Sequence, residues 1–188
     1  MSIPLDYTIS TPRLLLKSVA EEDLPFVFDA TRYEGFNDGM LWEPPASIAE
    51  LRPHLQSSAD DWVNEGDYSF SIWSVGVSGT FIGRISIRKT EMDKVYNIGY
   101  WTHPAHQGNG FMTEAVEAIL TFGFNKLEAI EIVAEYATWN EASGRVLEKV
   151  GMNRIAYIAE GFKKKGVWVS EYRMSINRSR WNGEEREE

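Results

Sequence analysis

At residues 106–115 the chain reads His106-Gln107-Gly108-Asn109-Gly110-Phe111-Met112-Thr113-Glu114-Ala115. Two glycines separate an expected strand, Asn97 to Thr102, from an expected helix that begins at Phe111. A glycine backbone can place several N–H groups around an anion, and the helix adds its unpaired N–H groups and the positive end of its dipole. The stretch therefore predicts a pyrophosphate cradle. The alternative is that the glycines only cap a strand-to-helix turn.

The commonest phosphate-binding motifs are absent from the chain. Neither GxxxxGKS/T nor GxGxxG occurs, so a P-loop and a dinucleotide fingerprint are both excluded. What remains is Gln107 and Gly110, with two residues between them, leading directly into a helix. This pattern resembles the acyl-CoA pyrophosphate loop of the GNAT superfamily of N-acetyltransferases.

The composition is that of an ordinary globular domain, with 188 residues, 43% hydrophobic and 25% charged. No apolar run reaches membrane-spanning length, and the first ten residues lack a basic start followed by an apolar segment. We therefore expect no signal peptide and no membrane helix. The absence of cysteine excludes disulfides, a catalytic thiol and Cys-zinc sites, and it fits a cytoplasmic location.

The three histidines, His54, His103 and His106, do not have the spacing of metal ligands. We expect no metal and interpret all three as loop or surface residues. Of these, only His106 is expected to lie near bound phosphates.

The net charge of −9 bears on possible partners. Removing the acidic end, Glu184 to Glu188, leaves the rest of the chain acidic as well. Direct nucleic-acid binding is not expected, because phosphate contacts need a positive face. An amine or a basic peptide is electrostatically favoured as a partner. The plainer alternative is that mild acidity only keeps the protein in solution.

The hydrophobic pattern predicts an α+β fold with one mixed, mostly antiparallel sheet of about seven strands and about four helices. The expected strands are 13–17, 69–75, 80–89, 95–102, 130–136, 154–162 and 167–176, with a turn at 76–79. The expected helices are 21–30, 47–63, 111–126 and 140–150. Pro53 should kink or delay the second helix, and Gly151 should cap the last. Residues 1–177 should form one domain, followed by an acidic solvated tail at 178–188.

Further motifs narrow the resemblance. The order of elements, with the glycine loop between the fourth strand and the third helix, is similar to the GNAT fold. Residues 11–16, Thr11-Pro12-Arg13-Leu14-Leu15-Leu16, resemble the opening of the RimJ/RimL-type branch. Its second signature is similar to residues 140–152, Asn140-Glu141-Ala142-Ser143-Gly144-Arg145-Val146-Leu147-Glu148-Lys149-Val150-Gly151-Met152. The resemblance covers roughly residues 11–177, nearly the whole chain.

The resemblance implies acetyl-CoA as a cosubstrate. The pyrophosphate would lie on the loop residues Gln107, Gly108, Asn109, Gly110, Phe111, Met112 and Thr113. The pantetheine arm would run along Tyr100, Trp101 and Thr102, with a main-chain N–H facing the thioester and Asn140 contacting the arm. Gly99 could support a bulge that frees main-chain groups. The plainer alternatives are an ordinary core strand and an ordinary helix N-cap at Asn140.

The resemblance also implies three catalytic residues. The Ser143 hydroxyl would donate to the leaving sulfur, and Tyr172 would donate to the thiolate, as a tyrosine does in other branches. Glu160 would accept the amine proton through water, because its apolar neighbours would raise its pKa. The plainer alternatives are a favourable helix-start residue at Ser143, a surface acid paired with Lys163–Lys165 at Glu160, and core packing at Tyr172.

Three positions depart from the pattern of that branch. Met112 stands where a small residue is usual, which we expect to be tolerated. Asn97 stands where relatives often have Glu, so a base is missing there. Trp168 stands where relatives often have Asp, so an acceptor contact from that Asp is not expected.

These inferences together predict an enzyme that transfers an acetyl group from acetyl-CoA to a primary amine. Direct attack by the amine is expected, because there is no cysteine and no Ser–His pairing is evident. The expected acceptor is a protein N-terminal α-amine, as for ribosomal-protein acetyltransferases. The alternatives are a small amine, polyamine or aminoglycoside-like, and a catalytically silent acyl-CoA-binding module.

The chain also contains residues suited to an acceptor cleft. Phe36, Trp42 and Trp139 lie in predicted connections and are expected to line such a cleft. The long loop from Tyr33 to Pro45 is its expected lid. Many relatives are dimers, so a homodimer is expected, with neither nucleic acid nor membrane as a partner.

Overall fold

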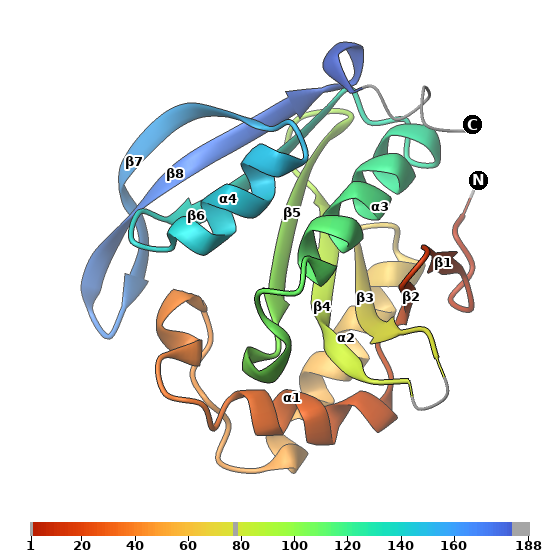
Figure 1. The fold of residues 1–188 in the computed structure, drawn as a ribbon, viewed down its shortest axis with the longest axis vertical. Coiled ribbons are helices and arrows are strands. Elements are labelled where there is room, and N and C mark those ends of the chain that lie inside the picture. The colour runs from red at the N-terminus through yellow and green to blue at the C-terminus, as the bar shows by residue number, and fades with distance from the viewer. Residues whose placement is uncertain (1, 77–78, 182–188) are drawn as a thin grey trace.

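The computed structural model describes residues 2–76 and 79–181. Its strands form one eight-stranded sheet in the order β1-β2-β3-β4-β5-β6-β8-β7 (Figure 1). Adjacent strands are antiparallel except for the parallel pair β5 and β6. The mixed, mostly antiparallel sheet expected from the sequence is confirmed. The strands are β1 (Thr8–Ser10), β2 (Leu14–Ser18), β3 (Asp67–Ser74), β4 (Phe81–Lys89), β5 (Val95–Thr102), β6 (Glu131–Ala137), β7 (Asn153–Lys164) and β8 (Val167–Asn177).

The α-helices of the described residues are α1 (Leu24–Ala30), α2 (Arg52–Val63), α3 (Phe111–Asn125) and α4 (Glu141–Lys149). Short 3-10 turns, η1 (Glu21–Asp23) and η3 (Ile48–Leu51), precede α1 and α2. Pro53 lies in the first turn of α2, where its missing N–H costs no hydrogen bond, so it begins this helix and does not kink it. The short edge strand β1 was not predicted. Val77 and Ser78 of the expected turn lie outside the described residues.

Helix α3 packs its apolar stripe on one face of the central strands (Figure 1). Ala115, Val116 and Ile119 are fully buried there, and burying an aliphatic side chain of this kind contributes about 1.5–3 kcal/mol. Gly123 lets the helix approach closely, because a Cβ at this position would lie 2.7–2.8 Å from the Cδ1 atoms of Ile132 and Ile87. The helix axis is therefore held near the sheet, and the N-terminus of α3 is directed to the end of β5.

Strands β5 and β6 separate after a short paired stretch. They pair only between residues 95–97 and 131–133, whereas β4 stays in regular register with β5 as far as Thr102. Beyond Asn97, the edge of β5 that faces β6 has no strand partner in the described part of the chain. The bulge considered at Gly99 does not form. Divergence of β6, not a bulge, therefore frees main-chain groups of β5.

The other face of the sheet is covered at one end by α1 and η3. Leu24 and Val27 of α1 pack with Leu51 and Phe81, and Trp101 of β5 packs against this cluster. In Figure 1, α1 crosses beneath the ends of the central strands, and the long β7–β8 hairpin extends to the far side. Helix α2 lies behind the central strands in Figure 1 and covers this face beside β3, where its Leu55 packs against the same cluster.

The chain remains packed beyond β8. Arg178–Arg180 form a short turn, the Arg178 N–H donates to the carbonyl of Ile130 at 3.0 Å, and the Trp181 ring lies 5.0 Å from that of Phe124. The segment expected to be a solvated tail from residue 178 is therefore packed as far as Trp181, and 182–188 lie outside the described residues. In the part described, no helix is long and apolar enough to cross a membrane.

Candidate active site

The loop between β5 and α3 has the shape of an anion cradle. Gly108 and Gly110 have φ of +78° and +76°, a backbone conformation that favours glycine. A Cβ on Gly108 would meet nothing within 4 Å, so the loop faces open space. Gly110 is the N-cap of α3 and offers no capping side chain. The N–H groups of Phe111, Met112 and Thr113 in the first turn are therefore available to a ligand.

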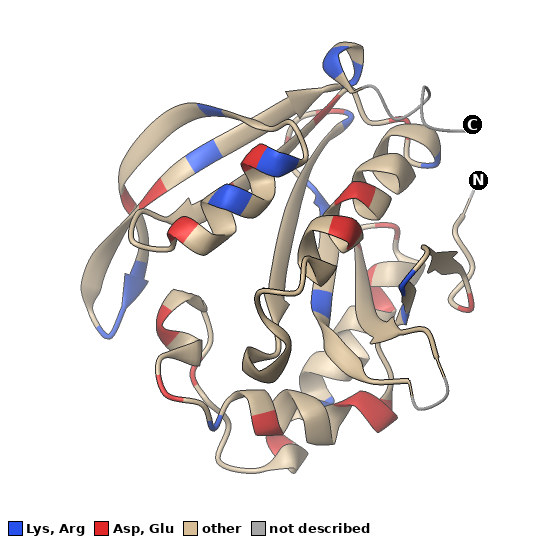
Figure 2. Cartoon of the chain, in the orientation of Figure 1, with Lys and Arg blue, Asp and Glu red and all other residues tan. Residues whose placement is uncertain are grey.

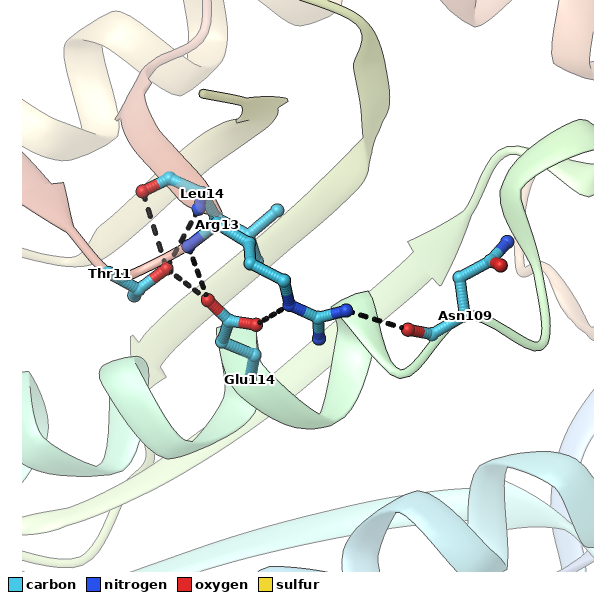
Figure 3. A network of polar contacts seen from close by, with 5 residues as sticks. All are labelled: Thr11, Arg13, Leu14, Asn109 and Glu114. Carbon is cyan, nitrogen blue, oxygen red and sulfur yellow. Dashed lines mark hydrogen bonds and ion pairs between the residues drawn. The ribbon is translucent and has the colours of Figure 1, made fainter. Parts of the chain in front are cut away.

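An ion pair holds this loop from the side of β2 (Figure 3). Arg13 Nε donates to Glu114 Oε2 at 2.6 Å, and Arg13 Nη1 donates to the Asn109 carbonyl at 3.0 Å. Glu114 Oε1 accepts from the Thr11 hydroxyl at 2.6 Å and from the Arg13 N–H at 2.9 Å. Burial disfavours the ionised carboxyl, but these hydrogen bonds outweigh it and hold the pKa of Glu114 below its usual value. The opening motif of the chain thus anchors the glycine loop.

The side chains of Gln107 and Asn109 form hydrogen bonds to main-chain carbonyls in and next to the loop. Gln107 Nε2 donates to the Thr102 carbonyl at 3.4 Å, and Asn109 Nδ2 donates to the carbonyls of His106 and Gln107, each at 3.1 Å. Met112 is 5% exposed and packs into the core. Because its large side chain is buried, it does not fill the open side of the glycine loop. Main-chain N–H groups line that side, and any residue at position 112 would supply one.

Two hydroxyl groups connect β5 to α4. The Tyr100 hydroxyl lies 2.9 Å from Ser143 Oγ and donates to the Ser143 carbonyl at 3.1 Å. Burial raises the pKa of Tyr100, against the opposing effect of the Ser143 hydrogen bond, so its hydroxyl keeps its proton. Asn140 caps α4, because its side chain accepts from the Ser143 N–H at 3.2 Å. The structure therefore brings the predicted residues Tyr100, Asn140 and Ser143 together.

The opposite face of the sheet has a cavity of about 1060 Å³. The β4–β5 register places Arg84 beside Trp101 and Arg88 beside Asn97, and all four residues line this cavity. Side chains alternate along a strand, so Tyr100 points to the other face, toward α4. Strand β5 therefore directs Tyr100 toward α4 and Trp101 toward the cavity, and Tyr100 also belongs to the cavity lining at the level where β6 has separated from β5.

The acetyltransferase (GNAT) domain family matches the chain over residues 13–153. The chain belongs to the GNAT acetyltransferases. It is thereby a member of a family of acetyl-CoA-dependent N-acetyltransferases. The glycine loop fits the CoA pyrophosphate, because its uncapped helix N-terminus and open glycine backbone leave N–H groups free on one side.

The relatives agree with this membership. The uncharacterized N-acetyltransferase YnaD of Bacillus subtilis is 34% identical over 177 residues, which is 93% of this chain and 99% of YnaD. The structure of RimL, a ribosomal L7/L12 alpha-N-protein acetyltransferase in complex with CoA, superimposes with a TM-score of 0.82 at 19% identity, covering 91% and 98% of the two chains. The Vibrio cholerae spermidine N-acetyltransferase in complex with CoA and spermine gives 0.77 at 20%, covering 91% and 99%. At these identities the two structures show the shared GNAT fold alone.

In this GNAT chain, Asn97 holds an acid in the cavity. Asn97 Nδ2 donates to Glu135 Oε2 at 2.5 Å, and Arg173 Nε donates to Glu135 Oε1 at 2.6 Å. The sequence comparison with GNAT relatives left no base at position 97, and the structure places the nearest carboxylate on β6 instead. Both Glu135 oxygens accept hydrogen bonds from these side chains. We therefore assign Glu135 a structural role.

A second acid in the cavity is free of such partners. Glu171 of β8 lines the cavity, and no hydrogen bond or ion pair links it to another residue in the described ranges. Burial and the Glu135 carboxylate raise the pKa of Glu171, with Arg173 opposing them. A Cβ on Gly161 would collide with the Glu171 carboxylate. Because Gly161 has no side chain, the carboxylate has space at this position. Alternation along β8 could have singled out Glu171, since it and Tyr172 must point to opposite faces.

The predicted residues Glu160 and Tyr172 lie elsewhere. Glu160 is exposed on β7, within an irregular stretch where Ile158 pairs with Glu171 and the next pair is four residues further along β7. The apolar setting expected for Glu160 is therefore not present, and this residue does not line the cavity. Tyr172 faces the side of α4, where its ring lies 5.7 Å from that of Tyr136 and 3.8 Å beneath the Arg154 guanidinium.

The loop predicted as a lid is tied to the β7–β8 hairpin. Lys164 Nζ donates to the carbonyls of Met40 and Trp42, each at 3.0 Å, and pairs with Glu43 at 2.9 Å. Met40 and Trp42 line the cavity. The Phe36 ring lies 5.2 Å from that of Trp101, so this aromatic residue packs at the cavity's end and does not line it.

Trp139 differs from expectation, whereas no acceptor contact was expected at Trp168. Trp139, 55% exposed, does not line the cavity but stands over Gly39 of the loop, where a Cβ would lie 3.3 Å from its ring. Trp168 lies beneath the Lys163 ammonium at 4.7 Å, near the tip of the basic β7–β8 turn (Figure 2). Neither aromatic side chain contacts the cavity directly.

His103 lies in the loop that follows β5, in agreement with its interpretation as a loop or surface residue, but it is buried. It is 6% exposed, and its Nε2 lies 3.0 Å from Asp29 Oδ2 of α1. Its Nδ1 accepts from the Ala105 N–H at 3.3 Å. His103 therefore ties the end of β5 to α1 just before the glycine loop, and sequence spacing could not show this contact.

Proposed function

We propose that this protein transfers the acetyl group of acetyl-CoA to the α-amine of a protein N-terminus. The observation that carries the proposal is the arrangement of two sites on opposite faces of one strand. The glycine loop and the Tyr100–Ser143 pair lie on one face of β5, and the cavity lies on the other. Strands β5 and β6 are not paired beyond Asn97, and the cavity lining there includes Tyr100.

Orientation supplies much of the rate in such a transfer, since holding two reactants together removes a large entropic barrier. Acetyl-CoA supplies the activated thioester when bound. The unpaired main-chain groups of β5 beyond Asn97 offer N–H donors for the carbonyl oxygen of the acetyl group. On the α4 side, the Ser143 hydroxyl would donate a hydrogen bond to the departing sulfur, and its contact with the Tyr100 hydroxyl supports this role.

The amine must lose a proton, and two carboxylates are candidates to accept it. Glu160 is the candidate from family resemblance, acting through water from its exposed position on β7. Glu171 is the candidate from geometry, because it lines the cavity, has no competing partner in the described chain, and has a raised pKa. Tyr172 stays a candidate donor to the thiolate, on the same face as α4.

A protein N-terminus is preferred as the acceptor because a solved relative of the same fold, RimL, is named for this reaction on ribosomal L7/L12. A small amine is the second candidate, favoured by the spermidine N-acetyltransferase whose fold is also shared. Thiol release from acetyl-CoA, measured with peptides, polyamines and aminoglycosides, tests both. Turnover with polyamines alone would favour a small amine over a protein N-terminus as the acceptor. CoA binding without any turnover would favour a catalytically silent acyl-CoA-binding module.

The expected homodimer also stays a prediction. Light scattering on the purified protein, with and without CoA, measures the assembly directly. A mass of one chain in both conditions would contradict it.

A further inference from the structure

The charges in the cavity are separated by sign. The basic side chains Arg84 and Arg88 project from β4, whereas Glu135 and Glu171 project from β6 and β8 on its other side. Arg173 is already paired with Glu135. Three strand spacings separate β4 from β8, about 14 Å before the side chains are counted. An acceptor that reached both sides would therefore need an amine at one end and an anionic group at the other.

Arg84 is the residue that most requires such a group. Its Nε and Nη2 are buried and have no hydrogen-bond partner in residues 2–76 and 79–181. Arg84 forms a long ion pair with Asp23, whose Oδ2 is 3.9 Å from Nη2, beyond hydrogen-bond distance. That oxygen already accepts from the Ser71 hydroxyl and the Ala20 N–H, and Asp23 Oδ1 forms no hydrogen bond within the described residues. Buried donors without acceptors are costly, and more so when the group is charged. An anion in the cavity would supply the missing acceptors.

Arg88 lies on the same basic side of the cavity and reaches β5. Its Nη2 lies so close to Gly99 that a Cβ there would be only 2.7 Å away. Gly99 therefore serves to admit the Arg88 guanidinium against β5, at the level where β6 has separated. Arg88 makes no hydrogen bond to another described side chain, although Asp67 lies in its electrostatic range.

We infer that the acceptor carries a carboxylate in addition to its reacting amine, and that Arg84 and Arg88 bind this carboxylate. The amine end lies toward Glu171. This inference rests on the proposed acetyl transfer and narrows its acceptor. The required chemistry is found in a peptide with an acidic residue next to its N-terminus and in a free acidic amino acid. It is not found in a polyamine, which would place positive charge beside two arginines.

The test compares acceptors that differ only in charge. Short peptides with an amidated C-terminus that begin Ser-Asp are paired with amidated peptides that begin Ser-Asn. Glutamate α-amide is paired with glutamine α-amide, and spermidine represents an amine without a carboxylate. We expect kcat/KM to favour the acidic member by about tenfold or more, the effect of one charge-assisted hydrogen bond. The peptide and amino-acid pairs show which source of the carboxylate is used.

The variants Arg84→Gln and Arg88→Gln should each remove this preference by raising KM for the acidic acceptor. CoA affinity should stay unchanged in both, which also reports that they fold. Arg52→Gln is the matched control, because Arg52 is an exposed arginine of α2 that does not line this cavity. Since Arg84 lies beside the buried Asp23, Arg88→Gln provides the test if Arg84→Gln fails to fold.

Equal turnover of the acidic and neutral members would overturn the inference and leave acetyl transfer intact. A preference that survives in Arg88→Gln and in a folded Arg84→Gln would also overturn it. Failure to acetylate any amine, with CoA still bound, is the distinct result that contradicts the proposed function itself.

Discussion

Arg13 Nε lies 2.6 Å from Glu114 Oε2, and this contact joins two motifs that are 101 residues apart in the chain. Arg13 immediately precedes β2, and Glu114 lies in the first turn of α3. The same guanidinium reaches the Asn109 carbonyl within the glycine loop. The loop's shape therefore depends on the edge of the sheet as well as on its own glycines.

Removing the carboxylate of this pair should weaken CoA binding. In Glu114→Gln the loop loses a charged anchor, so we expect the CoA dissociation constant to rise by about tenfold. Titration calorimetry measures it, with Lys94→Gln as a control that breaks an exposed ion pair to Glu128 elsewhere. An unchanged affinity in Glu114→Gln would show that the glycine loop holds its shape without the ion pair.

Replacing the two candidate bases should separate their roles. We expect Glu171→Gln to lower kcat by about a hundredfold, the usual contribution of a general base. Glu160→Gln should cost less, because that side chain is exposed and reaches an amine only through water. Steady-state kinetics at saturating acetyl-CoA measure both. A larger loss in Glu160→Gln would assign the proton transfer to β7.

Glu171→Gln, which should lower kcat, should nevertheless raise the stability of the folded protein. The pKa of Glu171 is raised in the folded protein by burial and by Glu135, so folding favours its protonated form. The contribution of Glu171 to stability is therefore largest below its ordinary pKa of 4.5 and is lost as pH rises through the raised value. Glu171→Gln should be more stable than the parent near neutral pH, with the difference lost in acid. Denaturant melts across this range test it, and a constant difference would exclude the effect.

The space beside Glu171 can be tested by filling it. Gly161→Ala places a methyl group against the Glu171 carboxylate, so we expect a large loss of kcat with CoA affinity retained. In the Glu171→Ala background the obstacle is absent, and Gly161→Ala should then have little further effect. Additive losses in the double variant would mean that Gly161 acts through the β7 backbone.

The contacts of Lys164 should control the mobility of the loop over the cavity. Its side chain is 11% exposed, and losing its hydrogen bonds should cost about 1–3 kcal/mol. In Lys164→Met, amide exchange in residues 36–42 should accelerate and KM for the acceptor should change, while CoA affinity stays constant. Lys163→Met, one residue away and stacked on Trp168, is the control. Equal exchange in both variants would contradict this.

Much of the fold followed from local patterns. The limits of α3 and α4 agree with expectation within one residue at their C-terminal ends, because apolar periodicity and glycine caps act over a few residues. Strand β1 was missed because three residues at an edge have too little pattern. The burial of His103 was missed because its partner, Asp29, lies 74 residues away on α1.

The sequence by itself determined the donor half of this protein. A pyrophosphate cradle needs only glycines, main-chain N–H groups and the start of a helix, and these are neighbours in the chain. Only the tertiary structure decided the candidate acceptor cavity. The cavity joins Arg84, Asn97, Glu135 and Glu171 from four strands, and whether a charged side chain there is paired, buried or free depends on strand register and on the separation of β6 from β5. No local pattern encodes that separation, because it arises from packing between elements distant in the chain.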